Sequence, residues 1–211
     1  VDVAVDAART LFDQATDMPS SAGFSLLLVY WGQFIDHDLS LTRDASGEII
    51  DVPDLVGPFH RSNYDPDSGT SPENPRAPVN EVTPGLDASM IYGSTSDRLA
   101  DLRSHEGGRL RMSDGALEAL NLLPLAAEGE VMAGAEATEA PIFLAGDVRA
   151  NENINLLALQ TLFMREHNYW ADHLAALYPQ WDDESLFNAA RSIVEYEIQW
   201  ITYSTWLPML L

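Results

Sequence analysis

The sequence predicts a mainly α-helical fold with long loops and little strand. Apolar residues recur at helical spacing over residues 155–177 and 183–203, whereas alternating strand patterns are scarce. Between the periodic segments lie stretches rich in Asp, Pro, Asn, Ser and Gly, a composition typical of loops. A chain of 211 residues can bury most of the surface of its unfolded form, so we expect one domain or one large piece of a domain.

In the first part of the chain, the apolar pattern predicts a short helix over residues 5–16 and a longer, mostly buried helix over residues 21–41. Residues 44–84 are dominated by turn-forming residues, and we expect a long irregular excursion there. Loops of this length inside a compact domain are usually functional or held in place by other groups.

In the second part, Ser94 or Ser96 is placed to cap a helix over residues 97–103. Residues 124–140 are rich in Ala, Glu and Gly, and we expect a surface loop. The two C-terminal helices are separated at Pro179, because proline interrupts helical hydrogen bonding.

The composition is strongly acidic: 33 Asp and Glu against 11 Lys and Arg give a formal net charge of −22. Such a surface repels phosphate backbones and anionic membranes, which argues against nucleic-acid binding. It suits divalent cations and an extracellular, secreted setting in which salt screens self-repulsion, although most of the acids are expected to be solvated surface.

Two residue counts exclude further classes of function. There is no cysteine, which rules out disulfides, thiolate catalysis, Cys-ligated zinc and iron–sulfur clusters. The longest apolar run, residues 24–31, is far too short for a membrane span, and polar residues follow it.

A first polar cluster ends the second predicted helix. Gln33 and His37 are four residues apart and share one helical face, with Asp36 beside them. Asp38 lies about 100° around the helix from His37, so its side chain must face different surroundings. A buried helix with these residues demands polar partners; the alternative is a helix end that emerges into solvent after Leu39.

A second cluster alternates oxygen donors along the chain. In an extended segment the Thr83 hydroxyl, the Gly85 carbonyl, the Asp87 carboxylate and the Ser89 hydroxyl would point to one side. Such hard oxygen donors favour calcium, and Asp38 is a candidate for an additional carboxylate. The alternative is a polar turn before the next helix.

A third cluster precedes the long helix at residue 155. Arg149 could stabilise developing negative charge if it faced a pocket, and Glu152 follows it. The alternative is a surface turn whose acids suit a helix N-terminus.

These clusters belong to four ordered motifs that together resemble the animal-type haem peroxidases of the peroxidase–cyclooxygenase superfamily. The motifs are WGQFIDHD at 31–38, LDASMIYGS at 86–94, LAGDVR at 144–149 and REHN at 165–168. The resemblance runs from about residue 8 to residue 211. It implies a helical haem-peroxidase fold, and bacterial relatives in this family lead us to expect a bacterial member.

The resemblance also implies roles for individual residues. His37 corresponds to the distal histidine, Gln33 to its neighbour over the haem, and Arg149 to the distal arginine. Asp36 and Glu152 match the two acids that form esters with haem b.

The same resemblance assigns a calcium site. Its ligands would be Asp38, Thr83, Asp87 and Ser89, with Gly85 contributing only its carbonyl.

A member of this family reduces hydrogen peroxide and oxidises a halide, thiocyanate or a small organic donor. Neutral His37 would take a proton from bound hydrogen peroxide and deliver it to the leaving oxygen, while Arg149 stabilises the charge that develops. Asn153 stands where the myeloperoxidase type has a methionine bonded to haem through sulfur. We therefore expect bromide, iodide, thiocyanate or phenolic donors in preference to chloride.

The family's proximal histidine lies downstream of the Arg149 motif, in a segment that this chain does not contain. We expect His60 in a loop, His105 in a surface turn, and His167 and His173 on the long helix, none of them as an axial ligand. Residues 1–211 are thus interpreted as the N-terminal, distal portion of an incomplete peroxidase domain. It would need a downstream segment or a second chain with the proximal histidine, and we expect the chain alone to be inactive.

Two alternatives stay open. One is a haem fatty-acid oxygenase of the same superfamily, although the cyclooxygenase branch lacks acids corresponding to Asp36, Asp38 and Glu152. The other is a catalytically inactive, peroxidase-like binding module, against which the intact set of Gln33, His37 and Arg149 argues.

Overall fold

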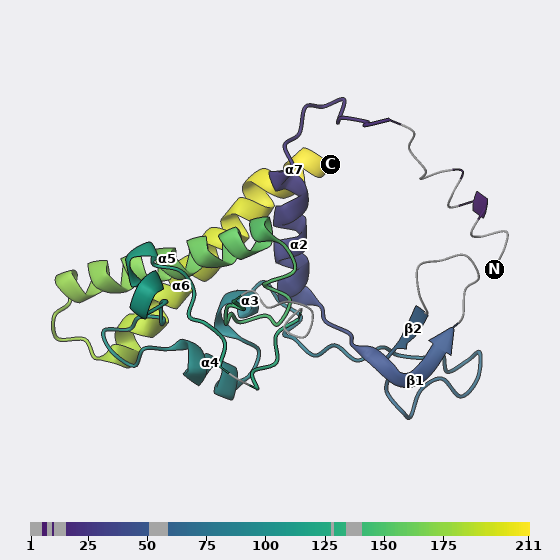
Figure 1. Ribbon diagram of the computed structural model, residues 1–211, viewed down its shortest axis with the longest axis horizontal. Coiled ribbons are helices and arrows are strands. Elements are labelled where there is room, and N and C mark those ends of the chain that lie inside the picture. Colours follow the sequence, from purple (N-terminus) through teal and green to yellow (C-terminus); the bar gives the residue numbers. More distant parts are fainter. Residues whose placement is uncertain (1–5, 8–9, 11–15, 51–58, 128, 134–140) are drawn as a thin grey trace. The chain divides into compact units, whose positions relative to one another are not determined.

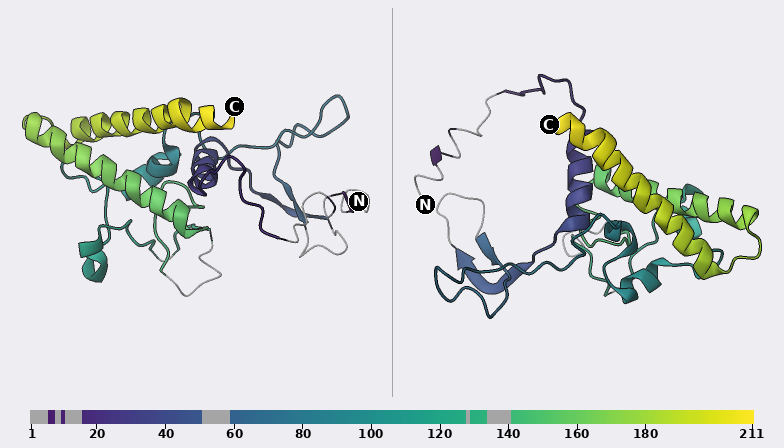
Figure 2. Two further views of the ribbon diagram at one scale, coloured as in Figure 1. Left: turned by 90° about the horizontal axis from the view of Figure 1, so that it is seen from above. Right: turned by 180° about the vertical axis from the view of Figure 1, so that it is seen from behind.

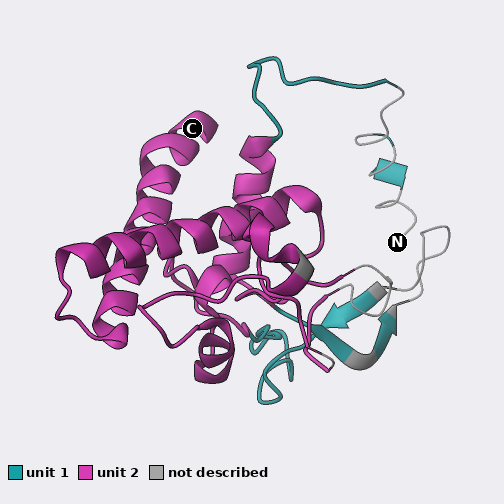
Figure 3. Cartoon of the chain, turned by 60° about the vertical axis from the view of Figure 1, so that its left-hand side comes forward, with its two compact units in different colours: residues 1–26, 42–79 teal, residues 27–41, 80–211 magenta. Residues whose placement is uncertain are grey.

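The computed structural model describes residues 6–7, 10, 16–50, 59–127, 129–133 and 141–211. The contacts within the chain define two units, coloured separately in Figure 3. One comprises residues 1–26 and 42–79 and contains a pair of strands; the other comprises residues 27–41 and 80–211 and contains the long helices. The predicted mainly helical class is confirmed.

Two long helices form an antiparallel hairpin in the larger unit (Figure 1 and Figure 2). Helix α5 spans Ile154–Leu177 and helix α6 spans Asp183–Ile201, which confirms the predicted pair. Asn153 caps α5 because its side-chain oxygen accepts the Leu156 N–H, and Asp182 caps α6 in the same way. A π-helical turn, η2 (Thr202–Trp206), and a short helix, α7 (Leu207–Leu210), continue from α6.

Helix α2 (Leu27–Leu39) carries the first polar cluster and is fixed by aromatic packing. The rings of Phe34 and Phe163 stack with their centroids 5.4 Å apart, and Trp31 contacts Phe163 at 5.9 Å. The Trp31 indole also donates a hydrogen bond of 3.2 Å to the Thr202 hydroxyl. These contacts between α2, α5 and η2 set the rotation of α2 and therefore the direction in which its polar residues point.

Helix α2 is shorter than the predicted helix over residues 21–41. Gly23 adopts a left-handed φ of 69°, so the helix cannot extend through it. At the other end the Asn80 side chain donates to the Leu39 carbonyl and accepts the Leu41 N–H, which closes the last turn. The expected burial is also only partly right, because Leu27 and Leu39 are exposed.

Two short helices lie between α2 and the hairpin. Helix α3 spans Ser89–Tyr92, and helix α4 spans Ser96–Leu102. The prediction of Ser94 or Ser96 as the cap of α4 was wrong: Thr95 accepts the Arg98 N–H. A 3-10 helix, η1, follows at Gly115–Leu120.

The smaller unit corrects the expectation of an irregular segment over residues 44–84. Strand β1 (Asp44–Ile50) pairs antiparallel with β2 (Phe59–Ser62), with an irregular register between Asp44 and Ile49. His60 therefore lies in a strand and not in a loop. Arg76 is held by both oxygens of Glu48 at 2.8 Å, which ties the later part of this segment to β1.

The remaining expectations concern loops and single histidines. The helix over residues 5–16 lies for the most part outside the described residues, as do residues 128 and 134–140 of the expected surface loop. His105 is exposed in a turn and His173 is exposed on α5, whereas His167 is fully buried. Within the described part of the chain, no helix is long and apolar enough to cross a membrane.

Candidate active site

His37 lies in the interior, with 3% of its surface exposed, on the last turn of α2. Burial lowers the pKa of His37 below its ordinary value, and the nearby Arg149 cation lowers it further, so the imidazole is neutral near pH 7. Its Nε2 atom lies 3.8 Å from Glu152 Oε2, and its Nδ1 atom lies 3.6 Å from Asp147 Oδ1. Neither separation is a hydrogen bond, and Nδ1 has no hydrogen-bond partner among the described residues.

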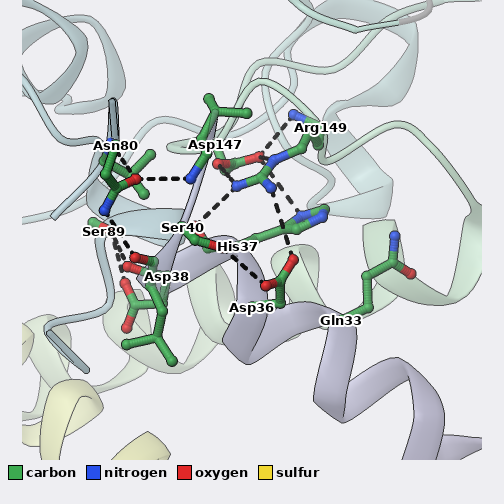
Figure 4. Close-up of polar contacts among 12 residues, drawn as sticks. Gln33, Asp36, His37, Asp38, Ser40, Asn80, Ser89, Asp147 and Arg149 are labelled. Carbon is green, nitrogen blue, oxygen red and sulfur yellow. Dashed lines mark hydrogen bonds and ion pairs between the residues drawn. The ribbon is translucent and has the colours of Figure 1, made fainter. Parts of the chain in front are cut away.

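Arg149 is brought to His37 by a tight turn between residues 144 and 153. Its Nη2 atom contacts the His37 carbonyl oxygen at 3.4 Å, and its Nη1 atom lies 3.9 Å from Asp36 Oδ2. Asp147 holds the guanidinium from the other side with bonds of 2.8 and 2.9 Å. Figure 4 shows these four side chains gathered at one end of α2.

Gln33 lies one helical turn before His37 and is fixed by two neighbours. Its amide nitrogen donates to Glu152 Oε2 at 2.9 Å, and its amide oxygen accepts from Asn153 Nδ2 at 2.9 Å. Asn153 therefore both caps α5 and orients Gln33. Gln33, His37 and Glu152 therefore lie beside one another, with Glu152 Oε2 facing both the amide nitrogen of Gln33 and the Nε2 atom of His37.

Asp36 and Glu152 are the accessible acids of the cluster. Their side chains are 61% and 40% exposed, whereas the side chain of Arg149 is 15% exposed. Asp36 also accepts a hydrogen bond of 3.0 Å from the Ser40 hydroxyl. The two acids thus flank a buried histidine and arginine on the accessible side of the cluster.

Asp38 points away from His37 and meets the second cluster (Figure 4). It is completely buried, and its two oxygens accept bonds from the Ser89 hydroxyl at 2.7 Å and the Ala88 N–H at 3.0 Å. Asp87 accepts from the Thr83 hydroxyl at 2.8 Å and from the Ser89 N–H at 3.2 Å. Ser89 therefore links the two carboxylates.

The segment that carries these donors is bent, contrary to the expected extended ladder. The Gly85 carbonyl accepts the N–H of Asp87, two residues on, and Ala88 adopts a left-handed φ of 58°. Thr83, Asp87 and Ser89 are therefore brought together by a turn, and not by the alternation of side chains along an extended segment. Gly85 lies in this turn, but no contact links its carbonyl to Asp38 among the described residues.

The chemistry of this oxygen cluster fits a hard cation. Burial raises the pKa of Asp38 to about 6 against the opposing effect of the hydrogen bonds from Ser89 and the Ala88 N–H, and the Asp87 carboxylate acts in the same direction as burial. Among the described residues no cationic side chain forms an ion pair with Asp38, and no group of three acidic or histidine side chains forms a metal site. Two carboxylates with two hydroxyls are an oxygen-only set, which calcium accepts when carbonyls or water complete it.

The roles of three residues at the site were not predicted from the sequence, although Asn153 was named there for a different reason. Asp147 holds Arg149, Asn153 orients Gln33, and Asn80 closes the end of α2. The two-residue spacing of Asp147 and Arg149 in a Gly-preceded turn was a usable signal for the first. The roles of Asn80 and Asn153 toward α2 depend on residues 39 to 120 positions away, and no local pattern marks them.

Comparison with known proteins assigns the chain to a family. The family model described as animal haem peroxidase matches residues 53–211, more than half of the chain. The chain belongs to the animal haem peroxidase family, which implies haem binding.

Two relatives show how much of a complete protein this chain covers. The peroxidasin homolog of Homo sapiens is 35% identical over an alignment of 243 residues, which covers 97% of this chain and 16% of that protein. Peroxidase A from Dictyostelium discoideum has a similar structure, with a TM-score of 0.82 and 28% identity, over 96% of this chain and 44% of that one. The chain thus spans less than half the length of these relatives.

A third similarity concerns the fold alone. A fatty acid alpha-dioxygenase from Arabidopsis thaliana matches with a TM-score of 0.74 and 22% identity, over 96% of this chain and 30% of that one. The helical scaffold is therefore shared with an enzyme whose name describes different chemistry, and the scaffold by itself does not select between them.

The residues present fit a haem on the accessible side of the cluster. The Nε2 atom of His37 lies 3.8 Å from Glu152 Oε2, beyond hydrogen-bond distance, and Glu152 is 40% exposed, so this nitrogen faces the accessible side of the cluster. Asp36 and Glu152 keep accessible carboxylates beside His37 and Arg149, as ester formation requires.

Proposed function

We propose that residues 1–211 form the distal portion of a haem peroxidase domain that reduces hydrogen peroxide and oxidises halide, thiocyanate or small organic donors. The observation that carries this proposal is the neutral, buried His37 within one cluster with Arg149 and Gln33. A neutral imidazole and a fixed cation are the pair that heterolytic cleavage of an O–O bond needs.

When bound, haem b would supply the iron that binds the peroxide and stores the oxidising equivalents. Asp36 and Glu152 would hold it through ester bonds. The Nε2 atom of His37 accepts a proton from hydrogen peroxide and returns it to the departing oxygen. The Arg149 guanidinium stabilises the negative charge on that oxygen, and Gln33, held by Glu152 and Asn153, orients the small molecule.

Calcium is proposed for the oxygen cluster of Asp38, Thr83, Asp87 and Ser89, with the Gly85 carbonyl as a fifth donor. Support comes from the buried Asp38 carboxylate, which has no cationic partner among the described residues. Because Asp38 follows His37 directly, a cation bound there would hold the end of α2 and with it the imidazole.

A second portion with the proximal histidine is proposed as the partner of this chain. The chain covers 44% of the peroxidase A chain, which supports an incomplete domain. The larger unit also exposes an apolar groove of about 490 Å³ between α5 and α6, in which Tyr196 is 64% and Trp200 is 54% exposed. A downstream segment or second chain would cover such a surface.

Two further proposals concern the electron donor and the location of the protein. Asn153 caps α5 and bonds Gln33, so no thioether is available at this position, and donors easier to oxidise than chloride are proposed. An extracellular location is proposed on the strength of the net charge of −22.

The test uses the complete domain, with residues 1–211 joined to the proximal portion. His37→Ala should slow the reaction with hydrogen peroxide by about 10²-fold or more in stopped-flow absorbance, because the proton acceptor is lost. His173→Ala, which removes an exposed histidine of α5, is the matched control and should react at the parent rate.

An unchanged rate for His37→Ala would remove His37 from the mechanism. Fatty-acid oxygenation by the complete protein without peroxidase turnover would favour the oxygenase alternative. Failure to develop a Soret band on addition of haem would favour the non-catalytic binding module.

A further inference from the structure

We propose that Asp147 is a positioning residue that fixes both partners of the proton-transfer pair: it orients the Arg149 guanidinium and selects the His37 tautomer with hydrogen on Nδ1. The proposal rests on the proposed function for its catalytic meaning. Its structural content concerns only residues of this chain.

Asp147 holds Arg149 through both of its carboxylate oxygens. Asp147 Oδ1 accepts from Arg149 Nε at 2.9 Å, and Oδ2 accepts from Nη2 at 2.8 Å, a bidentate arrangement. Oδ1 also accepts the backbone N–H of Arg149 at 2.8 Å. The Asp147 side chain is 1% exposed, so solvent does not weaken these bonds. The guanidinium consequently has one orientation, with Nη2 against the His37 carbonyl.

The imidazole of His37 also faces Asp147. The Nδ1 atom is buried and lacks a hydrogen-bond partner, and Asp147 Oδ1 lies 3.6 Å away. Asp147 Oδ1 already accepts two hydrogen bonds from Arg149, so an N–H on His37 Nδ1 would be a third donor that shares this oxygen. A shift of about half an ångström would bring it within hydrogen-bond distance, and hydrogen bonds at catalytic sites are often long before a ligand is bound.

Two carboxylates face the imidazole and favour opposite tautomers: Asp147 lies 3.6 Å from Nδ1, and Glu152 lies 3.8 Å from Nε2. Asp147 is nearer and 1% exposed, whereas Glu152 is 40% exposed and screened by solvent, so Asp147 has the stronger effect on the ring. Arg149 packs on the backbone of His37, and Asp36 acts on the ring only at a distance. With hydrogen on Nδ1, Nε2 carries the free lone pair that a proton acceptor needs on the accessible side. The opposite tautomer would place N–H toward the peroxide and a lone pair against the Asp147 carboxylate.

The backbone of Asp147 is itself fixed by its neighbours. Its backbone N–H donates to the Met90 carbonyl at 3.0 Å, which anchors it to α3. A Cβ atom on the preceding residue, Gly146, would lie 2.6 Å from three backbone atoms of α3 and its C-terminal neighbour. The Asp147 backbone is therefore pressed onto α3, which fixes the point from which its carboxylate reaches Arg149 and His37.

The test is histidine and arginine ¹⁵N NMR on the complete protein in its haem-free form and in its diamagnetic ferrous carbonmonoxide form. We expect His37 to show a protonated Nδ1 and a bare Nε2, and Arg149 to show a slowly exchanging Nε–H. Asp147→Asn should abolish the fixed tautomer and speed exchange of the Arg149 Nε–H by at least about tenfold. Asp147→Glu, which keeps the charge, should restore part of both signals.

Asp172→Asn is the matched control, because Asp172 pairs with Arg109 on the surface of the same unit. It should leave both signals unchanged. In the haem-loaded protein, Asp147→Asn should lower the rate constant for hydrogen peroxide by about 10- to 100-fold, with the KM for the donor unchanged.

Hydrogen on Nε2 in the unmodified protein would overturn the proposal, and this measurement needs no variant to fold. Parent-like signals in Asp147→Asn would overturn it as well. Because the haem-free spectra do not depend on peroxide turnover, a failure of the proposed function leaves the test of Asp147 intact.

Discussion

Neighbouring residues on α2 serve two different environments. His37 and Asp38 are about 100° apart around the helix, so one ring can face Asp147 and Glu152 while the next carboxylate faces Ser89. Both are buried, and each has oxygen atoms from a distant part of the chain beside it. A substitution that shifts Asp38 is therefore expected to shift His37 as well, because the two residues are adjacent in the chain.

Removal of one calcium ligand is the first prediction at this scale. Asp87→Ala should weaken calcium binding by at least about tenfold in isothermal titration, because one of two carboxylates is lost. Asp101→Ala, an exposed acid on α4, is the control for the change in net charge. Equal calcium titrations for Asp87→Ala and the parent would refute the site.

The second prediction concerns the ester bonds. After turnover with hydrogen peroxide, haem in the complete protein should resist extraction by acidified acetone. Asp36→Val combined with Glu152→Gln should make it extractable, because neither side chain can then form an ester. Extractable haem in the parent protein after turnover would show that no ester exists.

At the scale of elements, the short helix α3 connects the two halves of the site. Ser89 at its start contacts Asp38, and the carbonyl of Met90 holds the Asp147 N–H. Tyr92 at its end donates to His167 on α5. The four residues of α3 thus join the oxygen cluster, the turn at residues 144–153 that carries Arg149 (the arginine turn) and helix α5. A helix this short has little stability of its own.

Close contact between α3 and the arginine turn gives the third prediction. Gly146→Ala should lower the free energy of unfolding by about 3 kcal/mol in urea denaturation, because the added methyl meets backbone that cannot move aside. Gly85→Ala is the matched control: its Cβ would meet nothing within 4 Å, and it should change stability by less than about 1 kcal/mol. Equal stability of the two variants would contradict this packing.

At the scale of the whole molecule, a buried polar pair lies in the core of the larger unit. His167 Nε2 donates to the Gly108 carbonyl at 2.8 Å, and its Nδ1 accepts from the Tyr92 hydroxyl at 2.9 Å. Burial lowers the pKa of His167 to about 4, and the Arg103 and Arg191 cations act in the same direction. The imidazole is therefore neutral in the folded protein at every pH above that value.

The fourth prediction follows from this lowered pKa. Below its ordinary pKa of 6.5, His167 takes up a proton in the unfolded chain but not in the folded one. Stability from this residue is complete above pH 6.5 and is lost as the pH falls toward 4, by about 3 kcal/mol in total.

The measurement compares urea unfolding of the parent and of His167→Gln between pH 7 and pH 4.5. The difference in free energy between the two proteins should shrink as the pH falls. His173→Gln, on the exposed side of α5, should follow the parent throughout. A difference that stays constant with pH would contradict a buried neutral His167.

Local pattern predicted the long helices but not how the chain closes around them. The apolar spacing located α5 and α6 within two residues, because that spacing directly encodes which face is buried. It predicted a helix longer than α2 at both ends. Gly23 stops the helix through its left-handed backbone conformation, and Asn80 closes the other end through side-chain hydrogen bonds. It also missed β1 and β2, whose polar residues give no alternating pattern.

The sequence by itself determined the helical class and the family, and it supplied the residues for which catalytic roles are proposed, since helical periodicity and ordered motifs are local properties of the chain. Tertiary structure alone decided how those residues meet. Arg149 reaches the His37 carbonyl across 112 positions of sequence, and the link from Ser89 to Asp38 spans 51. Such contacts depend on the packing of α2 against α5 and on the turn pressed onto α3, and no spacing between neighbouring residues encodes either of them.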